Sequence, residues 1–328
     1  MHATNQHVGF WSTASKNNTL RAISYTGSFF EWEIDSNGQI TENEVAFLGG
    51  HSGRLKLQDI SWSPDGNVLI TCSEDQTTRS YTRFGKQFQR PQIHGYNLTR
   101  VDFINNHEFV SSAEEKEVRI FQGSKWYKSD LEKALGFSVN HNFEDCKLDR
   151  SIQQVLGLTN KDVGETNLKT EISKFTEETL VSDTLWPEKE KLYYHGNEVI
   201  ALKVDRKRGI IATSAKARNI NEGHIAIWKN CGSYYKVIQV LKSHHLTVVD
   251  MAWLETGELV SVGRDRDVRV WEVNSEGVDE VDVKEIANRK DDVCLKCVGK
   301  KHSRIIWAIE QVYDKLGLEY KHKKEEVN

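Results

Sequence analysis

Proline and cysteine are both scarce in this chain, and neither sign of charge dominates it. With 3 Pro and 5 Cys among 328 residues, the collagen-like and Pro-rich classes are excluded. The cysteines are odd in number and irregularly spaced, which favours a reducing compartment over a disulfide framework. Lys and Arg total 44 against 48 Asp and Glu, so the net charge of -4 gives no global attraction to nucleic acid or to an anionic membrane. Any polyanion must therefore bind to a local patch.

Long apolar runs are also missing. No segment approaches the roughly 20 apolar residues of a membrane span, and the opening MHATNQHVGF lacks the apolar core of a signal peptide. We therefore expect a cytoplasmic and nuclear protein with no membrane partner. The chain is 38% hydrophobic and 28% charged, which suits a folded protein, and its length predicts two domains or one large repeat array.

Four similar segments recur along the chain, each of which begins at a His and ends at an aromatic residue. A hydroxyl residue follows the His by 17 to 20 positions, and in three segments an acidic residue comes four positions later. The four sets are His51, Thr71, Asp75 and Tyr81; His94, Ser111, Glu115 and Phe121; His195, Thr213 and Trp228; and His244, Ser261, Asp265 and Trp271.

Short β-branched and aromatic stretches between polar turns predict about three strands in each repeat. The first two repeats start 43 residues apart, within the ~40–45 residue period of a propeller blade and outside that of helical repeats. The predicted fold class is therefore all-β, built of WD40 β-propeller blades.

In each repeat the four positions predict a hydrogen-bond relay in which His, hydroxyl, carboxylate and aromatic donor satisfy one another away from water. The fourth repeat alone has a complete set. In the second repeat Phe121 cannot donate and Glu115 is longer than Asp, and in the third repeat Ala217 stands at the acidic position.

Several phrases that blade geometry does not require also occur, among them RPQIHGYNL (90–98), LGLTNK (156–161), KLYYHGNE (191–198) and HSRIIW (302–307). Through them the chain resembles the WD-repeat family formed by the second subunit of the Elongator complex, over most of residues 20–307. The resemblance implies a non-catalytic scaffold without a cofactor. Its implied partners are the large scaffold subunit and the catalytic subunit, which modifies carbon 5 of the wobble uridine of transfer RNA. Contact with the transfer RNA itself is expected to be indirect.

The resemblance further implies that the chain covers parts of two consecutive propellers. We expect a partial first propeller over 1–121, an insertion over 122–190, and a partial second propeller over 191–328. Within the insertion, DLEKALGF predicts a short helix over 130–137 with Asp130 as its N-cap, and the polar composition of 166–183 predicts a mobile surface loop. A generic WD-repeat interaction protein, a nonfunctional truncated copy and a propeller enzyme are the alternatives.

Two further motifs do not fit the chemistry that they suggest at first sight. Ser52 lies in GHSGR, which lacks the second Gly of a nucleophile elbow. Cys294 and Cys297 precede His302, but no second ligand pair is available to complete a zinc site. We therefore expect neither catalytic residues nor a metal.

Two features could contact a partner. Lys203, Arg206, Lys207 and Arg208 form the densest basic cluster and could contact RNA phosphates, although no aromatic residue is interleaved for base stacking. Trp126 and Trp186 lie in the insertion and could anchor a protein partner, with burial in the core favoured for Trp186.

Overall fold

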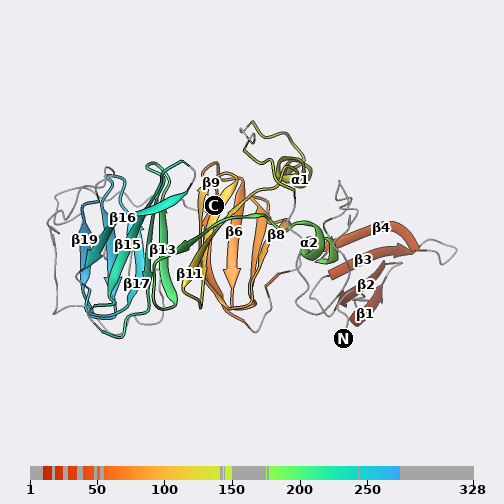
Figure 1. The fold of residues 1–328 in the computed structure, drawn as a ribbon. Coiled ribbons are helices and arrows are strands. Elements are labelled where there is room, and N and C mark those ends of the chain that lie inside the picture. The colour runs from red at the N-terminus through yellow and green to blue at the C-terminus, as the bar shows by residue number, and fades with distance from the viewer. Residues whose placement is uncertain are drawn as a thin grey trace, which may run out of the picture. The chain divides into compact units, whose positions relative to one another are not determined.

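The structure is a computed structural model that describes residues 10–273, with gaps at 17–18, 25–28, 35–39, 48–49, 52–54, 141–142, 144, 150–174, 176, 220, 233 and 243. The described residues form five sheets and two short helices (Figure 1). By internal contacts the chain divides into two compact units, one of residues 1–110 with 120–189 and the other of 111–119 with 190–328.

The first unit contains two complete sheets of four antiparallel strands, each in sequential order. One consists of β1 (Phe10–Lys16), β2 (Thr19–Ser24), β3 (Phe29–Ile34) and β4 (Ile40–Phe47). The other consists of β5 (Leu57–Trp62), β6 (Val68–Ser73), β7 (Thr77–Thr82) and β8 (Gln87–Ile93).

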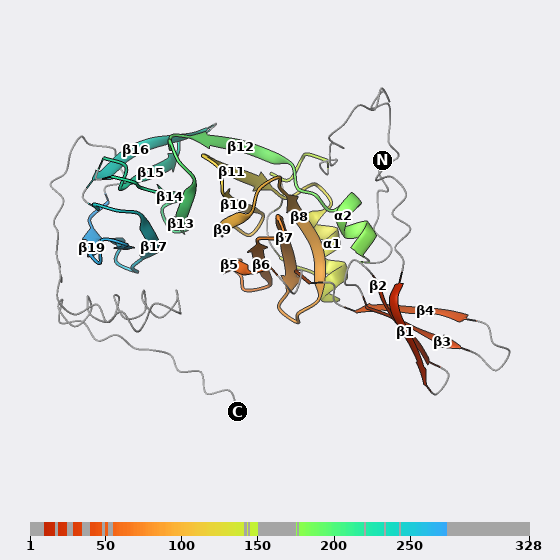
Figure 2. The same cartoon turned by 90° about the horizontal axis from the view of Figure 1, so that it is seen from below.

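A third sheet is formed by β9 (Leu98–Asn105), β10 (Glu108–Ala113), β11 (Glu117–Gln122) and β12 (Glu188–Tyr193) in the order β12-β11-β10-β9. Strand β12 runs beside β11, although 65 residues of chain separate these two strands (Figure 2). The expected insertion over 122–190 therefore lies between the third and fourth strands of one blade.

The second unit contains an antiparallel sheet of β13 (Val199–Asp205), β14 (Ile210–Ala215), β15 (His224–Asn230) and β16 (Tyr235–Lys242). Beside it are the three antiparallel strands β17 (Val248–Trp253), β18 (Leu259–Gly263) and β19 (Val268–Trp271). Apolar side chains from both sheets, including Ile210, Met251 and Trp271, form one buried core. Burial of such side chains is the main stabilising contribution to the packing of blade on blade.

The predicted fold class, all-β with WD40 blades, is confirmed by this architecture of short sequential strands. The domain boundaries at 121/122 and 190/191 stay a prediction. In the described part of the chain, neither helix has the length and apolarity needed to cross a bilayer.

Helix α1 (Tyr127–Leu135) occurs in the insertion as expected, but its predicted start is wrong. Trp126 occupies the N-cap without a side-chain hydrogen bond, while Asp130 lies in the first turn and is buried. The Asp130 carboxylate accepts a hydrogen bond from Gln89 Nε2 at 3.0 Å. Asp130 therefore makes a tertiary contact and does not cap the helix. Gly136 ends the helix with a φ of 80°, a conformation that favours glycine.

The prediction of a surface loop over 166–183 is also wrong for its last seven residues, which form α2 (Glu177–Asp183). Glu177 and Leu180 are buried there, and α2 contacts β8 (Figure 2). Tertiary packing has thus produced a helix that the polar composition did not indicate. Residues 166–174 and 176 lie outside the described part of the chain.

Candidate functional site

The fourth repeat joins all four of its predicted residues by hydrogen bonds. His244 Nδ1 lies 2.9 Å from Asp265 Oδ2, and its Nε2 lies 2.7 Å from Ser261 Oγ. Trp271 Nε1 donates to the same hydroxyl at 2.7 Å. With Nδ1 donating to the carboxylate, Nε2 accepts the Ser261 proton, so each buried polar group has a partner. Burial alone would raise the pKa of Asp265, but its hydrogen bond with His244 holds that pKa below its ordinary value.

The first repeat has the same arrangement. His51 Nδ1 lies 2.9 Å from Asp75 Oδ2 and its Nε2 lies 2.7 Å from Thr71 Oγ1. Thr71 Oγ1 also donates to the Arg79 carbonyl at 3.3 Å, and Tyr81 closes the repeat as a partly buried aromatic residue on β7. Burial opposes ionisation of Asp75, but its hydrogen bonds with His51 and Thr77 lower the pKa of the carboxyl strongly.

The carboxylates of the first and fourth repeats also shape the turns that carry them. Asp75 Oδ1 accepts the backbone N–H of Thr77 at 3.1 Å, and Asp265 Oδ1 accepts that of Asp267 at 3.3 Å. The residue inside each turn, Gln76 or Arg266, has a positive φ of 66° or 69°. A short side chain that accepts a hydrogen bond from the backbone two residues on stabilises such a tight turn.

The third repeat has a relay without its carboxylate. His195 Nε2 lies 2.8 Å from Thr213 Oγ1, and Trp228 Nε1 donates to that hydroxyl at 2.8 Å. His195 is only 6% exposed, and its Nδ1 has no hydrogen-bond partner. Burial, with a smaller contribution from His224, lowers the pKa of His195 to about 3. The imidazole is therefore neutral at physiological pH.

The second repeat does not bring its four residues together in a relay. His94 Nδ1 accepts the backbone N–H of Tyr96 at 2.9 Å, and the buried Ser111 Oγ has no hydrogen-bond partner. Glu115 pairs with Arg119 at 2.9 Å. Phe121 instead stacks on Phe109 with ring centroids 5.1 Å apart. An apolar contact has replaced the relay in this blade.

The relays predict a specific difference in stability between Asp265 and Glu115, which hold the same position in their repeats. Replacing Asp265 by Ala is expected to lower the free energy of unfolding by about 1–3 kcal/mol, because His244 loses its partner in a buried site. Glu115→Ala removes a pair with Arg119 whose side chains are 13% and 23% exposed, and is expected to cost about 1 kcal/mol or less. Urea denaturation followed by tryptophan fluorescence measures both. Equal losses in the two variants would reject the relay as a source of stability.

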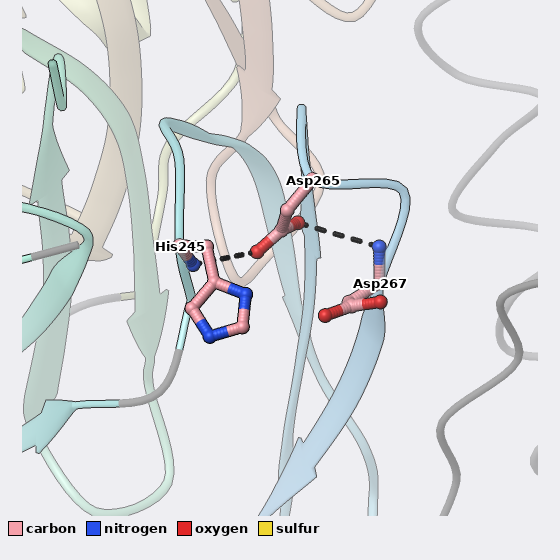
Figure 3. Close-up of side chains that lie close together, drawn as sticks. All are labelled: His245, Asp265 and Asp267. Carbon is pink, nitrogen blue, oxygen red and sulfur yellow. Dashed lines mark hydrogen bonds between the residues drawn. The ribbon is translucent and has the colours of Figure 1, made fainter. Parts of the chain in front are cut away.

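One group of potential metal ligands lies beside the fourth relay. Ligand atoms of His245, Asp265 and Asp267 lie within 4.8 Å of one another in the described part of the chain (Figure 3). Asp265 already accepts hydrogen bonds from His244, from the backbone of His245 and from the backbone of Asp267. Asp267 pairs with Arg269 at 2.8 Å. These carboxylates are used inside the repeat, and we assign no metal to them.

Ser52, Cys294, Cys297 and His302 lie outside the described residues.

The basic cluster predicted from the sequence lies at the end of β13 and in the following turn. Arg206 and Lys207 are exposed, and Lys203 is half-buried. Arg208 has structural contacts: it pairs with Asp205, donates to the Val273 carbonyl at 2.9 Å, and its guanidinium carbon lies 4.9 Å from the Trp253 ring centroid. The four residues therefore do not form one freely exposed basic surface.

Sequence reasoning missed a group of contacts that fixes the insertion to β8. Trp186 is 2% exposed, its indole Nε1 donates to Gln89 Oε1 at 2.8 Å, and its backbone N–H donates to the Pro91 carbonyl at 2.9 Å. The Arg90 N–H donates to Thr184 Oγ1 at 2.8 Å. The chain on either side of Trp186 thus covers strand β8, which would otherwise be an unpaired edge.

A buried ion cluster reinforces this attachment. Glu177 of α2 lies 3.1 Å from Arg79 Nη1 and also pairs with Arg90, and all three side chains are buried. Arg79 lies within 3.9 Å of Asp75, the carboxylate of the first relay. Burial and the neighbouring charge of Arg79 lower the pKa of Arg90 to about 9. Because the Glu177 carboxylate pairs with both arginines, the position of α2 depends on the negative charge of Glu177.

Comparison with known proteins agrees with the repeats. The family described as "WD domain, G-beta repeat" matches residues 42–81 and 235–272, which contain every predicted relay residue of the first and fourth repeats. Elongator complex protein 2 of Danio rerio is 30% identical over 333 aligned positions, which cover 89% of this chain and 39% of that protein. The protein of the same name from Saccharomyces cerevisiae is 31% identical, with 93% and 41% covered, and that from Homo sapiens is 28% identical, with 88% and 39% covered. The chain spans about two fifths of the length of these curated relatives.

Proposed function

Because the chain is a WD-repeat relative of Elongator complex protein 2, we propose that it acts as a scaffold subunit of the Elongator complex. The observation that carries this proposal is a similarity over about nine tenths of the chain, a share too large to be confined to the repeats. A match confined to the blades would support only a general WD-repeat protein, because the blade pattern is shared by proteins of many functions.

In this role the protein binds other subunits and performs no chemistry itself. The His, hydroxyl and carboxylate groups that a hydrolase would bring to an open cleft are, in the first and fourth repeats, hydrogen-bonded to one another. Groups used in this way stabilise the blades and position their loops. Rigid blades with exposed loops then provide the surfaces on which partners assemble.

The proposed partners are the large scaffold subunit and the catalytic subunit of the complex, in the cytoplasm and the nucleus. The chain would hold these two subunits together while the catalytic subunit modifies carbon 5 of the wobble uridine of transfer RNA. No cofactor is needed for this role.

Deleting the gene that encodes this chain is therefore expected to lower the carbon-5 modification of wobble uridine in transfer RNA, because the catalytic subunit loses its attachment. Nucleoside analysis of total transfer RNA by mass spectrometry measures the loss. A complementing copy with Ser52→Ala should restore modification, which separates a scaffold from a serine hydrolase. Normal modification in the deletion strain would contradict the proposed function.

A further inference from the structure

A pair of exposed aromatic rings lies where the β7–β8 turn meets the end of α1. The Phe84 and Phe137 ring centroids are 6.5 Å apart, with the rings almost perpendicular at 81°. The guanidinium carbon of Arg83 lies 5.0 Å from the Phe84 centroid and 6.0 Å from that of Phe137. We call these three residues, together with Lys86 of the same turn, the Phe84 surface.

The two rings are placed on the outside by the local backbone. Phe84 precedes Gly85, whose φ of 81° closes the turn between two strands. Phe137 follows Gly136, which ends α1 in a left-handed conformation. Phe84 is 64% exposed and Phe137 is 44% exposed, so neither ring contributes its full area to a core. Neighbouring exposed aromatic residues of this kind mark a binding surface more often than a lone exposed apolar residue does.

Both charged side chains of the β7–β8 turn are positive. Arg83 and Lys86 are exposed, and among the described residues no carboxylate lies within ion-pair distance of either of them. Lys86 Nζ lies over the Phe175 ring at 5.3 Å. The nearby Glu132 accepts the Val139 N–H at 2.9 Å and pairs with Lys128. The cations beside the rings therefore remain available to an anionic ligand.

We propose that the Phe84 surface binds single-stranded nucleic acid, with bases stacked on Phe84 and Phe137 and phosphates bound by Arg83 and Lys86. Single-strand sites combine aromatic rings with cations that follow the phosphate backbone, because every base has a flat face that can stack. Arg also stacks on bases, so Arg83 serves both functions.

The basic cluster at Lys203 to Arg208 lacks this combination. Its aromatic neighbour Trp253 is partly buried and packs against the core of the second unit, and the Trp253 indole donates to the Lys203 carbonyl at 3.3 Å. That cluster offers charge without a free ring. The proposal goes beyond the scaffold role and does not rest on it, since a scaffold needs no contact with nucleic acid.

The test uses fluorescence anisotropy of the purified chain with a labelled 12-nucleotide oligouridine. Removing both rings (Phe84→Ala with Phe137→Ala) leaves the charge unchanged and is expected to weaken binding at least about five-fold, the low end of the stacking energy of one base. The wild type should bind an abasic 12-mer more weakly than oligouridine, and the ring variant should bind the abasic 12-mer as the wild type does.

Oligothymidine should bind like oligouridine, because ring stacking does not read the 2′-hydroxyl. Phe84→Leu with Phe137→Leu, which keeps apolar volume, should weaken binding as well.

A charge-matched pair of variants separates this surface from general electrostatics. Arg83→Ala with Lys86→Ala should weaken oligouridine binding more than Arg206→Ala with Lys207→Ala, which removes the same charge elsewhere. Equal losses, unchanged binding in the ring variants, or no binding by the wild type would overturn the proposal. So would tighter binding of a 12-residue polyglutamate peptide, which would assign the surface to an acidic protein. Assembly of the complex does not enter this test, so its failure leaves the scaffold role standing.

Discussion

Replacing Trp186 by Ala is expected to lower the free energy of unfolding by about 3–5 kcal/mol, the cost of truncating a large, fully buried aromatic side chain. Its ring centroid lies 5.2 Å from that of Phe109 and 4.8 Å from that of Tyr127. The substitution empties the space between β10 and α1 and also leaves Gln89 Oε1 without its indole donor. Both effects lower the free energy of unfolding, so Trp186→Ala is the single substitution from which we expect the largest loss of stability.

Trp126 provides the matched control for that measurement. It lies in the same insertion but is only half-buried, at the N-cap of α1. Trp126→Ala is therefore expected to cost much less than Trp186→Ala when both are measured by urea denaturation with circular dichroism. If the two variants lost equal stability, Trp186 would not be the residue that holds the insertion against the blade.

Acidification between pH 6.5 and pH 4 is expected to destabilise the second unit through His195. Its pKa is about 3 in the folded chain against an ordinary value of 6.5. The unfolded chain therefore binds this proton first, and stability present above pH 6.5 is lost as the pH falls towards 3. The loss approaches about 1.4 kcal/mol per pH unit within this window, so about 3 kcal/mol is expected by pH 4.

A His195→Gln variant should lack this part of the pH dependence, because Gln can hydrogen-bond to Thr213 but does not titrate. The window above pH 4 avoids Asp75 and Asp265, whose lowered pKa values make stability fall only near and below their ordinary value of 3.8. Urea midpoints at a series of pH values compare the two proteins. Parallel curves for wild type and variant would show that His195 is not the group responsible.

The relays were accessible to sequence reasoning because their spacing is constrained by the blade. His244, Ser261 and Asp265 occupy fixed places in a loop, on a strand and in a turn, so the same offsets recur wherever the geometry recurs. The second repeat shows the limit of such reasoning. The missing donor at Phe121 was visible in the sequence, but the stacking of Phe121 on Phe109 that replaces the relay was not.

The attachment of the insertion could not be read from the sequence for a different reason. Glu177 binds Arg79 across 98 residues, and Trp186 binds Gln89 across 97. No periodic pattern connects positions so far apart, and the polar residues around Glu177 are equally compatible with a solvated loop. The uncovered edge of β8 supplies the physical cause, and that edge is known only when the sheet order is known.

Affinity purification of the tagged intact protein from its own cells, followed by mass spectrometry of the proteins bound to it, tests the central claim most directly. We expect to recover the large scaffold subunit and the catalytic subunit of the Elongator complex together, in amounts comparable with the bait. The same purification from cells that carry Trp186→Ala should recover less of both, because the insertion and the blade that it covers lose their packing. Recovery of neither subunit with the wild-type protein would contradict the account.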